Sequence, residues 1–408
     1  MTQNDKIRIR ELAKIYMEMA QSEKQQDMFR RMKATNDLNV VRPPLSIDEI
    51  PWYQMDIGDE LKCICEDEKA RNVETFFLRA IYRWKHFKAD TYFEPFFRVT
   101  MHYDSTGIGI EAEEDIRRTD DINNIISHSY KDLLEDEDSV ELIKIPTFTR
   151  RKDKDDEAMA FYTELLGDVM PVKLCGRGYI YHAPWDIIAR LRGLENILFD
   201  LYDRPEHIHN IRKRFHDITL KEMDFIESEL AVDPTFPELH CTPALASCLE
   251  GKEGLKGTWL RTMAQGFSDI SPDMHYEFDI KYSIDLAKRF GLTYYGCCEP
   301  LDKKLNVITK LENLRKIGVT PWAKEEVMAE FIGNKYVYSR KPNPAYVAMV
   351  ADADAIRKEA EKTVKTALKY GCPLDITLKD ISTVSHRPEN LIVWSETVSE
   401  VLDKYYGK

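Results

Sequence analysis

The sequence has no excess of basic residues and no long apolar run, and each lack excludes a class of protein. Its formal net charge is −13, whereas binding to nucleic acid or to an anionic membrane surface needs a basic face. No segment approaches the roughly 18 consecutive apolar residues of a membrane span. The charged, amphipathic start MTQNDKIRIRELAKIYMEMA is unlike a signal peptide. We therefore expect a cytoplasmic protein whose partners include no nucleic acid and no membrane; the sequence is compatible with a homo-oligomer.

Cysteine is also scarce for a disulfide-stabilised protein. Eight cysteines in 408 residues do not form the dense framework of a small secreted domain, and in a reducing compartment they are expected to be free thiols. Hydrophobic residues make up 43% and charged residues 32% of the chain, a mixture typical of a globular protein with a large core. A catalytic or metal-binding role must therefore be argued for each cysteine separately, from the residues around it.

The N-terminal part of the chain is expected to be helical. Residues 5–33 have apolar positions spaced by three and four, and Pro43 with Pro44 ends that region. A second helix rich in aromatic residues is expected over 73–87. We interpret residues 1–90 as an N-terminal helical extension that packs on a larger domain formed by residues 91–408.

In the larger domain, short apolar or β-branched runs alternate with helical segments, which is typical of parallel βαβ units. Helices are expected after Ser271, which precedes a proline, and over 323–331 and 352–370, the last ended by Gly371. The expected strands are residues 95–101, 170–176, 239–247, 257–263, 293–299, 314–321, 335–341 and 373–379. Eight such strands predict an α/β fold of the (β/α)8 TIM-barrel type. Without the strand at 239–247, a doubly wound open sheet would compete.

In such a barrel the catalytic groups lie at the carboxyl ends of the strands. The stretch YYGCCEP ends one of them. Adjacent residues of a strand point to opposite faces, so Cys297 and Cys298 share one centre only if the chain turns there, which Pro300 would allow. Thiolates bind zinc, and we predict a zinc site formed by Cys297, Cys298 and His240. Two alternatives stay open: small residues that only fill a crowded strand end, and a vicinal disulfide.

Other polar and aromatic residues at or near the strand ends are candidates for catalysis and substrate binding. Those expected to act in catalysis are Glu299, Lys379 and Asp380, with Glu299 or Asp380 as a further metal ligand. Those expected to bind substrate are His102, Trp259, Gln265, Tyr295, Trp322, Lys341 and Asn343. The alternative for the aromatic residues is ordinary packing, and for the lysines and Asp380 it is a structural ion pair.

Four segments resemble the uroporphyrinogen decarboxylase superfamily. They are VKLCGRGYIYHAPWDIIARLRGLENILFDLYDRPEHIHNI, ISPDMHYEFDIKYSIDLAKRFGLTYYGCCEPL, SRKPNPA and ITLKDISTVSHRPENL. The resemblance implies a (β/α)8 barrel. It also implies one of two activities, since the superfamily contains true decarboxylases and cobalamin-dependent methyltransferases.

The methyltransferase branch is the closer resemblance. True decarboxylases carry a motif similar to RxPVWxMRQAGR, of which VVRPPLSIDEIPWYQM keeps only Arg42. Thiol-methylating members hold zinc through a His-x-Cys and a distant Cys. Here Cys297 takes the first Cys position, Tyr295 stands where the His would be, and Asp380 lies near the distant Cys. Carboxylates such as Glu299 or Asp380 would suit the arrangement of methoxy-demethylating members.

The resemblance thus implies an enzyme that moves a methyl group, with zinc, between a small methylated substrate, a methoxylated one included, and a corrinoid carried by a partner protein. A second hypothesis is a uroporphyrinogen decarboxylase-like lyase for a carboxylated tetrapyrrole or related substrate. Lys341, Lys379 or Arg340 would then hold carboxylates, and Asp104 or Asp380 would act as the acid. A third is a barrel that binds a corrinoid or another ligand without catalysis.

Overall fold

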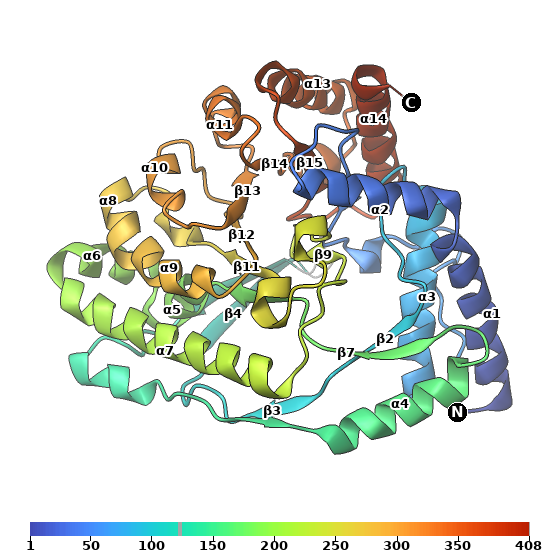
Figure 1. The fold of residues 1–408 in the computed structure, drawn as a ribbon, viewed down its shortest axis with the longest axis horizontal. Coiled ribbons are helices and arrows are strands. Elements are labelled where there is room, and N and C mark those ends of the chain that lie inside the picture. The colour runs from blue at the N-terminus through green and yellow to red at the C-terminus, as the bar shows by residue number, and fades with distance from the viewer. Residues whose placement is uncertain (121–124, 408) are drawn as a thin grey trace.

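The centre of the molecule is a sheet of seven parallel strands in the order β1-β15-β14-β13-β12-β11-β8. The structure, a computed structural model, describes residues 1–120 and 125–407. The sheet curves as an arc with helices outside it (Figure 1). The strands are β1 (Leu45–Ile47), β8 (Tyr179–His182), β11 (Trp259–Thr262), β12 (Leu292–Tyr295), β13 (Leu314–Val319), β14 (Val337–Arg340) and β15 (Leu374–Leu378).

The fold is mixed α/β with a half-barrel, not the closed eight-stranded barrel expected from the sequence. β1 and β8 are the edges of the sheet, and no strand pairing among the described residues joins them. The five strands expected beyond residue 257 are present as β11 to β15. The expected strands at 95–101 and 170–176 form β2 (Phe97–Thr100) and β7 (Val172–Cys175), which pair with each other in a separate parallel sheet.

The expected strand at 239–247 is instead a short antiparallel hairpin inside the arc of the sheet. Its strands are β9 (Glu238–Leu239) and β10 (Thr242–Pro243), and β9 lies near the middle of the molecule in Figure 1. Asp48, just beyond β1, accepts a hydrogen bond from the backbone of Cys241 at 3.0 Å. The ring of His240 packs edge-on against Tyr181 of β8, with centroids 5.6 Å apart. The hairpin therefore contacts both edges of the open sheet.

Side chains along each strand alternate between the two faces of the sheet. Those on the inner face include polar residues, and the hairpin presents further polar groups to that face. Lys316 of β13 and Asp375 of β15 form an ion pair at 2.9 Å, and both are buried. Thr242 of the hairpin accepts a hydrogen bond from Lys316 and donates one to Asp375. The outer face carries apolar residues, among them Leu260 and Ile317, which belong to the main hydrophobic core under the helices.

Three N-terminal helices lie beside the sheet: α1 (Gln3–Ala20), α2 (Glu23–Asn36) and α3 (Glu68–His86). The single helix expected over 5–33 is two helices, since Ser22 caps a new one by accepting a hydrogen bond from Gln25 N. The helix expected over 73–87 is present as α3. β1 lies within residues 1–90 yet belongs to the main sheet, while the domain division at residue 90 stays a prediction.

The remaining helices follow the local signals in the sequence. Ser271 caps α8 with Pro272 at the first helical position, and Gly371 ends α13 in the left-handed conformation at φ 67°. The remaining helices are α4 (Lys152–Leu166), α5 (Pro184–Arg192), α6 (Leu194–Asp203), α7 (Pro205–Glu229), α8 (Pro272–His275), α9 (Lys281–Lys288), α10 (Leu305–Ile308), α11 (Glu325–Ile332), α12 (Ala345–Ala348), α13 (Ala353–Tyr370) and α14 (Glu389–Tyr406). A π-helical turn, Tyr276–Ile280, joins α8 to α9.

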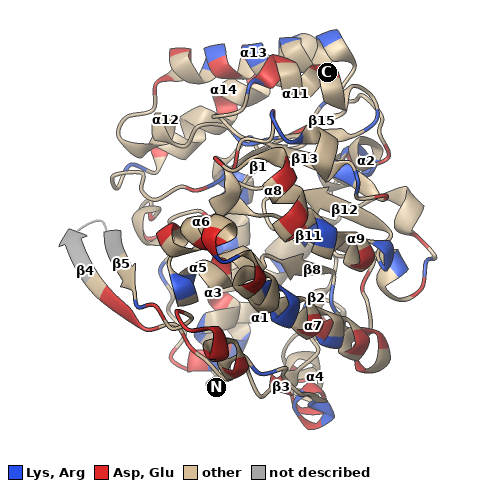
Figure 2. Ribbon diagram, turned by 90° about the vertical axis from the view of Figure 1, so that its left-hand side faces the viewer, with Lys and Arg blue, Asp and Glu red and all other residues tan. Residues whose placement is uncertain are grey.

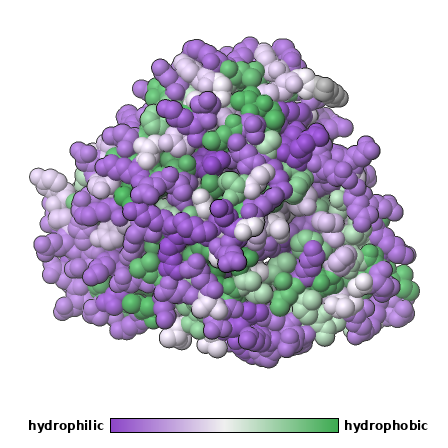
Figure 3. Space-filling view, in the orientation of Figure 1, coloured by the Kyte–Doolittle hydropathy of each residue, from purple (hydrophilic) through white to green (hydrophobic). Residues whose placement is uncertain are grey.

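Two antiparallel strand pairs lie outside the sheet. β3 (Tyr103–Ser105) pairs with β6 (Phe148–Arg150), and β4 (Glu114–Asp120) pairs with β5 (Ile125–Tyr130). Figure 2 shows β4 and β5 extending from the body of the molecule. On the face shown in Figure 3, hydrophobic residues form scattered patches among hydrophilic ones. Within the described residues, no helix is long and apolar enough to cross a membrane.

A buried histidine on the outer face of the sheet should make stability depend on pH. His182 is buried between Thr219 and Arg212, with its ring nitrogens 3.1 Å from each partner. Burial, and then the charge of Arg212, lowers the pKa of His182 well below its usual 6.5. The unfolded chain takes up a proton at this residue below that pH and the folded chain does not. The contribution of His182 to stability is therefore complete above pH 6.5 and is lost as the pH falls.

We expect the free energy of unfolding of the native protein to fall more than that of His182→Gln when the pH is lowered. The extra loss should be about 1.4 kcal/mol for each full unit below about pH 6.5. Urea unfolding at about pH 7.5 and about pH 5.5, followed by tryptophan fluorescence, measures both proteins. Parallel pH dependences of the two proteins would contradict a neutral buried His182.

Candidate functional site

The two adjacent thiols lie at the carboxyl end of β12, where the chain turns out of the strand. Gly296 makes this turn with φ 107°, a conformation that favours glycine. As a result Cys297 and Cys298 do not point to opposite faces. The ammonium of Lys379, which follows β15, lies 3.4 Å from the sulfur of Cys297 and 3.2 Å from that of Cys298. The turn therefore brings both thiols to one cation.

Cys298 and Lys379 also meet Asp380. The sulfur of Cys298 lies 3.2 Å from Oδ2 of Asp380, and the same oxygen is 2.7 Å from the Lys379 ammonium. Lys379 is buried whereas the Asp380 side chain is 49% exposed. The group of thiols, ammonium and carboxylate is thus reachable from solvent on the side of Asp380.

A hydrogen bond between the two thiols makes them unequal. Because Cys298 donates to Cys297 across 3.6 Å, the pKa of Cys297 is lowered, and contacts with His240, Arg261 and Lys379 lower it further. The same contact raises the pKa of Cys298. Burial alone would lower the pKa of Lys379, but the charge of Cys297 raises it. A negative charge on this pair is therefore favoured on Cys297 over Cys298.

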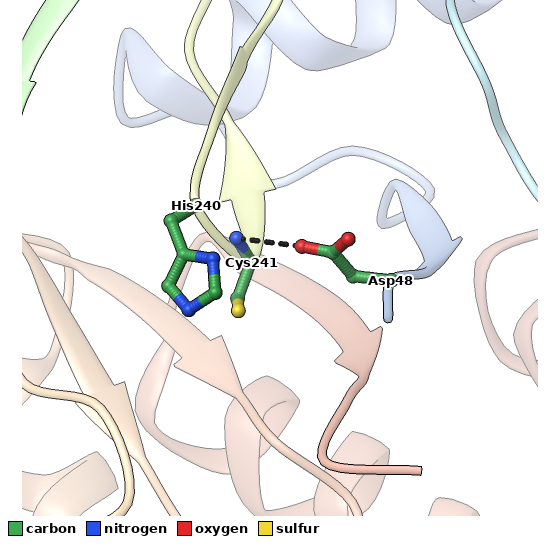
Figure 4. A group of neighbouring side chains, drawn as sticks. All are labelled: Asp48, His240 and Cys241. Carbon is green, nitrogen blue, oxygen red and sulfur yellow. Dashed lines mark hydrogen bonds between the residues drawn. The ribbon is translucent and has the colours of Figure 1, made fainter. Parts of the chain in front are cut away.

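The tip of the hairpin brings a second group of ligand atoms to the same end of the sheet. Asp48, His240 and Cys241 each offer one oxygen, nitrogen or sulfur atom, and these atoms lie within 4.8 Å of one another (Figure 4). The side chain of His240 also lies within hydrogen-bonding reach of Cys297. The two groups are therefore adjacent, with His240 between them.

Three residues around this centre have backbones in the left-handed region, which non-glycine residues seldom adopt. They are Glu49 (φ 52°), Cys241 (φ 63°) and Asp380 (φ 57°). Glu49 accepts a hydrogen bond from the backbone of Asp380 at 2.6 Å, which links the ends of β1 and β15. Strained backbones of this kind collect at functional sites, where the surrounding structure holds them in place.

Glu299 lies behind the thiols as a buried carboxyl. Its oxygens accept hydrogen bonds from the backbones of Cys297 at 3.0 Å and Ala264 at 3.4 Å. Burial, and then the charge of Cys297, raises the pKa of Glu299 to about 7. Near neutral pH this group can therefore hold or release a proton beside the thiols.

Arg261 of β11 lies on the inner face of the sheet, below the thiols. It is fully buried, and none of its three guanidinium nitrogens has a hydrogen-bond partner among the described residues. The rings of Tyr181 and Tyr294 lie 4.9 and 5.0 Å from the guanidinium carbon. An arginine stays charged when buried, so its field favours a negative charge on Cys297.

The donors at this centre fit zinc. Thiolate, imidazole and carboxylate are its usual ligands, and four of them complete a tetrahedral site. Asp48, His240 and Cys241 would supply three ligand atoms, and Cys297, beside His240, would be the fourth. The ligand set predicted from the sequence, Cys297, Cys298 and His240, shares His240 and Cys297 with this one. It stays a prediction, as does zinc itself.

The structure brings most of the predicted catalytic and metal-binding residues together but only some of the predicted substrate-binding residues. Lys341 reaches the centre, since its ammonium donates to the carbonyl of Cys241 at 2.5 Å. Gln265 contacts the sulfur of Met263 at 3.3 Å, and Met263 packs against Cys297. These two lie beside the thiols.

The other predicted substrate-binding residues lie elsewhere. Tyr295 points to the helical side of the sheet, where its hydroxyl lies 2.8 Å from Asp279. Trp259 is buried under the hairpin and donates to the carbonyl of Ala244. Trp322 is 67% exposed. Asn343 caps the turn before α12, and His102 is paired with Asp155 at 2.9 Å.

Sequence reasoning did not find Asp48 or Arg261, and it considered Cys241 only as part of the His240-Cys241 pair, of which His240 alone entered the predicted zinc site. Asp48 follows β1, a strand of three residues after two prolines, which pattern analysis does not detect. Cys241 directly follows His240 in the sequence, inside the strand that was expected at 239–247. Arg261 lies two residues after Trp259 on β11, so strand alternation places both on the inner face.

Comparisons with known proteins leave the family open. No family model matches the chain, and no curated protein matches it. Among solved structures, it is similar to a methyltransferase from Methanosarcina mazei with 13% sequence identity, over 93% of this chain and 99% of that chain, at a TM-score of 0.45. The function is therefore argued from the site itself.

Proposed function

We propose that this protein is a methyltransferase that moves a methyl group between a small methylated substrate and a corrinoid carried by a partner protein. The observation that supports this best is the group of thiol, imidazole and carboxylate side chains at the tip of the β9–β10 hairpin and at the carboxyl ends of β1, β12 and β15. The resemblance of four sequence segments to the uroporphyrinogen decarboxylase superfamily points in the same direction.

The residues of this chain would divide the work by position. Asp48, His240 and Cys241 would hold zinc, with Cys297 beside them, and bound zinc would act as a Lewis acid and keep a thiolate ligand deprotonated. Arg261 and Lys379 would stabilise negative charge on the thiols. Glu299 would hold or release a proton at its carboxyl. Asp380, on the exposed side, lies where a partner protein can approach.

The proposal is tested by following a methyl group from donor to acceptor. The purified protein is incubated with reduced cobalamin, in place of the partner's corrinoid, and with methyl ethers, methylamines or methyl thioethers in turn. We expect one donor class to be consumed while the visible spectrum of the corrinoid changes. Cys297→Ser should slow this transfer at least about tenfold. Cys248→Ser, which changes an exposed thiol, should leave it unchanged.

The buried cations favour a second candidate, a lyase for a carboxylated substrate. Arg261, Lys341 and Lys379 are all buried at or below the strand ends, and such cations can hold carboxylates. The same preparation is therefore offered a carboxylated tetrapyrrole, and released carbon dioxide is measured. Release of carbon dioxide with no consumption of any methyl donor would replace the first proposal by the second.

A further inference from the structure

A cavity of about 720 Å³ lies on the flank of the molecule. It is formed by one face of α3, the segment from Thr91 to Thr100, and the residues that lead into the hairpin. Glu238, two residues before His240, belongs to its lining. The carboxyl of Glu238 lies within range of the charges of Asp48 and Arg83. The cavity thus borders the hairpin, and its described lining includes none of the three cysteines Cys241, Cys297 and Cys298.

Nine of the 21 residues that line the cavity are aromatic. Those from the N-terminal region and α3 include Trp52 and Phe76, and those from the opposite wall include Phe96, Tyr162 and Phe236. Phe76 is 45% exposed, so the wall is reachable from solvent. A surface of this kind binds a flat ring, by apolar contact and by ring-on-ring packing.

The charges of the cavity select the polar end of a ligand. Arg79 and Arg83 lie four residues apart on α3, and so on one face of the helix. Neither forms an ion pair with a described carboxylate. Arg79 lies over the ring of Trp52 at 5.1 Å, and Arg83 donates to the carbonyl of Ile47 at 3.1 Å. The third arginine of the wall, Arg98, is already paired with Glu94 and Asp233.

Two carboxyls, those of Glu94 and Glu238, belong to the described lining of the cavity, and Glu94 is already paired with Arg98. A second positive charge on the same helix face costs stability unless an anion compensates it. Arg79 and Arg83 have no such anion as an ion-pair partner among the described residues, which leaves room for a negative group of a ligand.

We propose that this cavity binds a small aromatic carboxylate, with the ring between the aromatic walls and the carboxylate on Arg79 and Arg83. Guanidinium groups bind carboxylates through paired, charge-assisted hydrogen bonds. An organic cation would meet two unpaired arginines, and a neutral apolar ligand would remove them from water without a partner. The site does not depend on methyl transfer at the thiols, so the two proposals can fail separately.

Isothermal titration calorimetry with benzoate as the probe tests the site in the full-length protein. We expect a dissociation constant of about 1 mM, a scale set by the few heavy atoms of benzoate. Benzamide, which has the ring without the charge, and inorganic phosphate, which has the charge without the ring, should each bind at least about tenfold more weakly. Binding of either as tight as that of benzoate would overturn the proposal, as would no benzoate binding.

Variants locate the binding. The double variant Arg79→Gln with Arg83→Gln should weaken benzoate binding at least about tenfold, and Phe76→Ala should weaken it several-fold. Arg71→Gln, on the same helix but outside the cavity lining, is the matched control and should bind as the native protein does. Phe76 and Arg79 are exposed or on the cavity rim, so these variants should fold, which circular dichroism checks. Unchanged affinity in the folded double variant would contradict the site.

Discussion

Replacing Cys241 by serine should remove bound zinc from the protein. The native chain is expected to hold about one zinc per molecule after purification without chelator. Cys241 offers a thiol within 4.8 Å of the ligand atoms of Asp48 and His240. Serine keeps the size of the side chain but loses the thiolate that zinc prefers. Metal content is measured by inductively coupled plasma mass spectrometry on the two proteins side by side.

Two further cysteine variants make this test decisive about the ligand set. Cys298→Ser should keep most of its zinc, because Cys298 faces Lys379 and Asp380 instead of His240. Cys248→Ser, which changes an exposed thiol outside the proposed ligand set, should keep all of it. If Cys298→Ser loses zinc and Cys241→Ser retains it, the ligands are those predicted from the sequence and the hairpin tip is not the metal centre. A native protein without zinc under these conditions would contradict both sets.

Without a bound metal, the negative charge of the buried thiols would have to be stabilised by the protein alone. The ammonium of Lys379 already contacts both sulfurs, and Arg261 adds a second buried charge. These cations, together with the hydrogen bond from Cys298 and the contact with His240, would then stabilise a thiolate, and the carboxylated substrates of the second candidate function would be favoured. The zinc content thus distinguishes the two proposed reactions: bound zinc favours methyl transfer, and a metal-free centre favours the lyase.

The sequence predicts much of this site because the signal lies at strand ends. Glu299, Lys379 and Asp380 each follow a strand whose apolar run is easily seen, and parallel strands bring such ends together. The adjacency of Cys297 and His240, by contrast, depends on the hairpin entering the arc of the sheet. Strands of two residues are too short to show a periodic pattern, so the sequence does not predict this hairpin.

The errors have the same physical origin. Tyr294 and Tyr295 sit on opposite faces of β12, and only strand register shows that Tyr294 faces Arg261 while Tyr295 faces Asp279. The expected strands at 95–101 and 170–176 are real strands, but their pairing partners are set by tertiary packing. β1 is too short for its composition to distinguish it from a loop. Because the pairing of these strands is not visible in the sequence, a closed barrel was expected where the structure has an open half-barrel.

Replacing Asp375 by asparagine should be among the most destabilising single changes in the inner face of the sheet. Asp375 accepts hydrogen bonds from Ser339 at 2.6 Å and Thr242 at 3.2 Å and pairs with Lys316, all of them buried. Asparagine leaves the ammonium of Lys316 without its counter-ion in a dry interior. The expected loss is about 3–5 kcal/mol in the free energy of unfolding, the usual cost of breaking one side of a buried ion pair. Urea unfolding monitored by tryptophan fluorescence measures it.

The double variant Lys316→Met with Asp375→Asn separates the charge from the hydrogen bonds. With neither charge present, no uncompensated ion is buried, so the double variant should be less destabilised than the sum of the two single variants. Glu326→Gln, which breaks an exposed pair with Lys369, should change stability little. Strict additivity of the two buried changes would mean that Thr242 and Ser339, and not the ion pair, hold the hairpin to the sheet. In that case the position of His240 and Cys241 would depend on neutral hydrogen bonds alone, and Asp375→Asn should leave the zinc content intact.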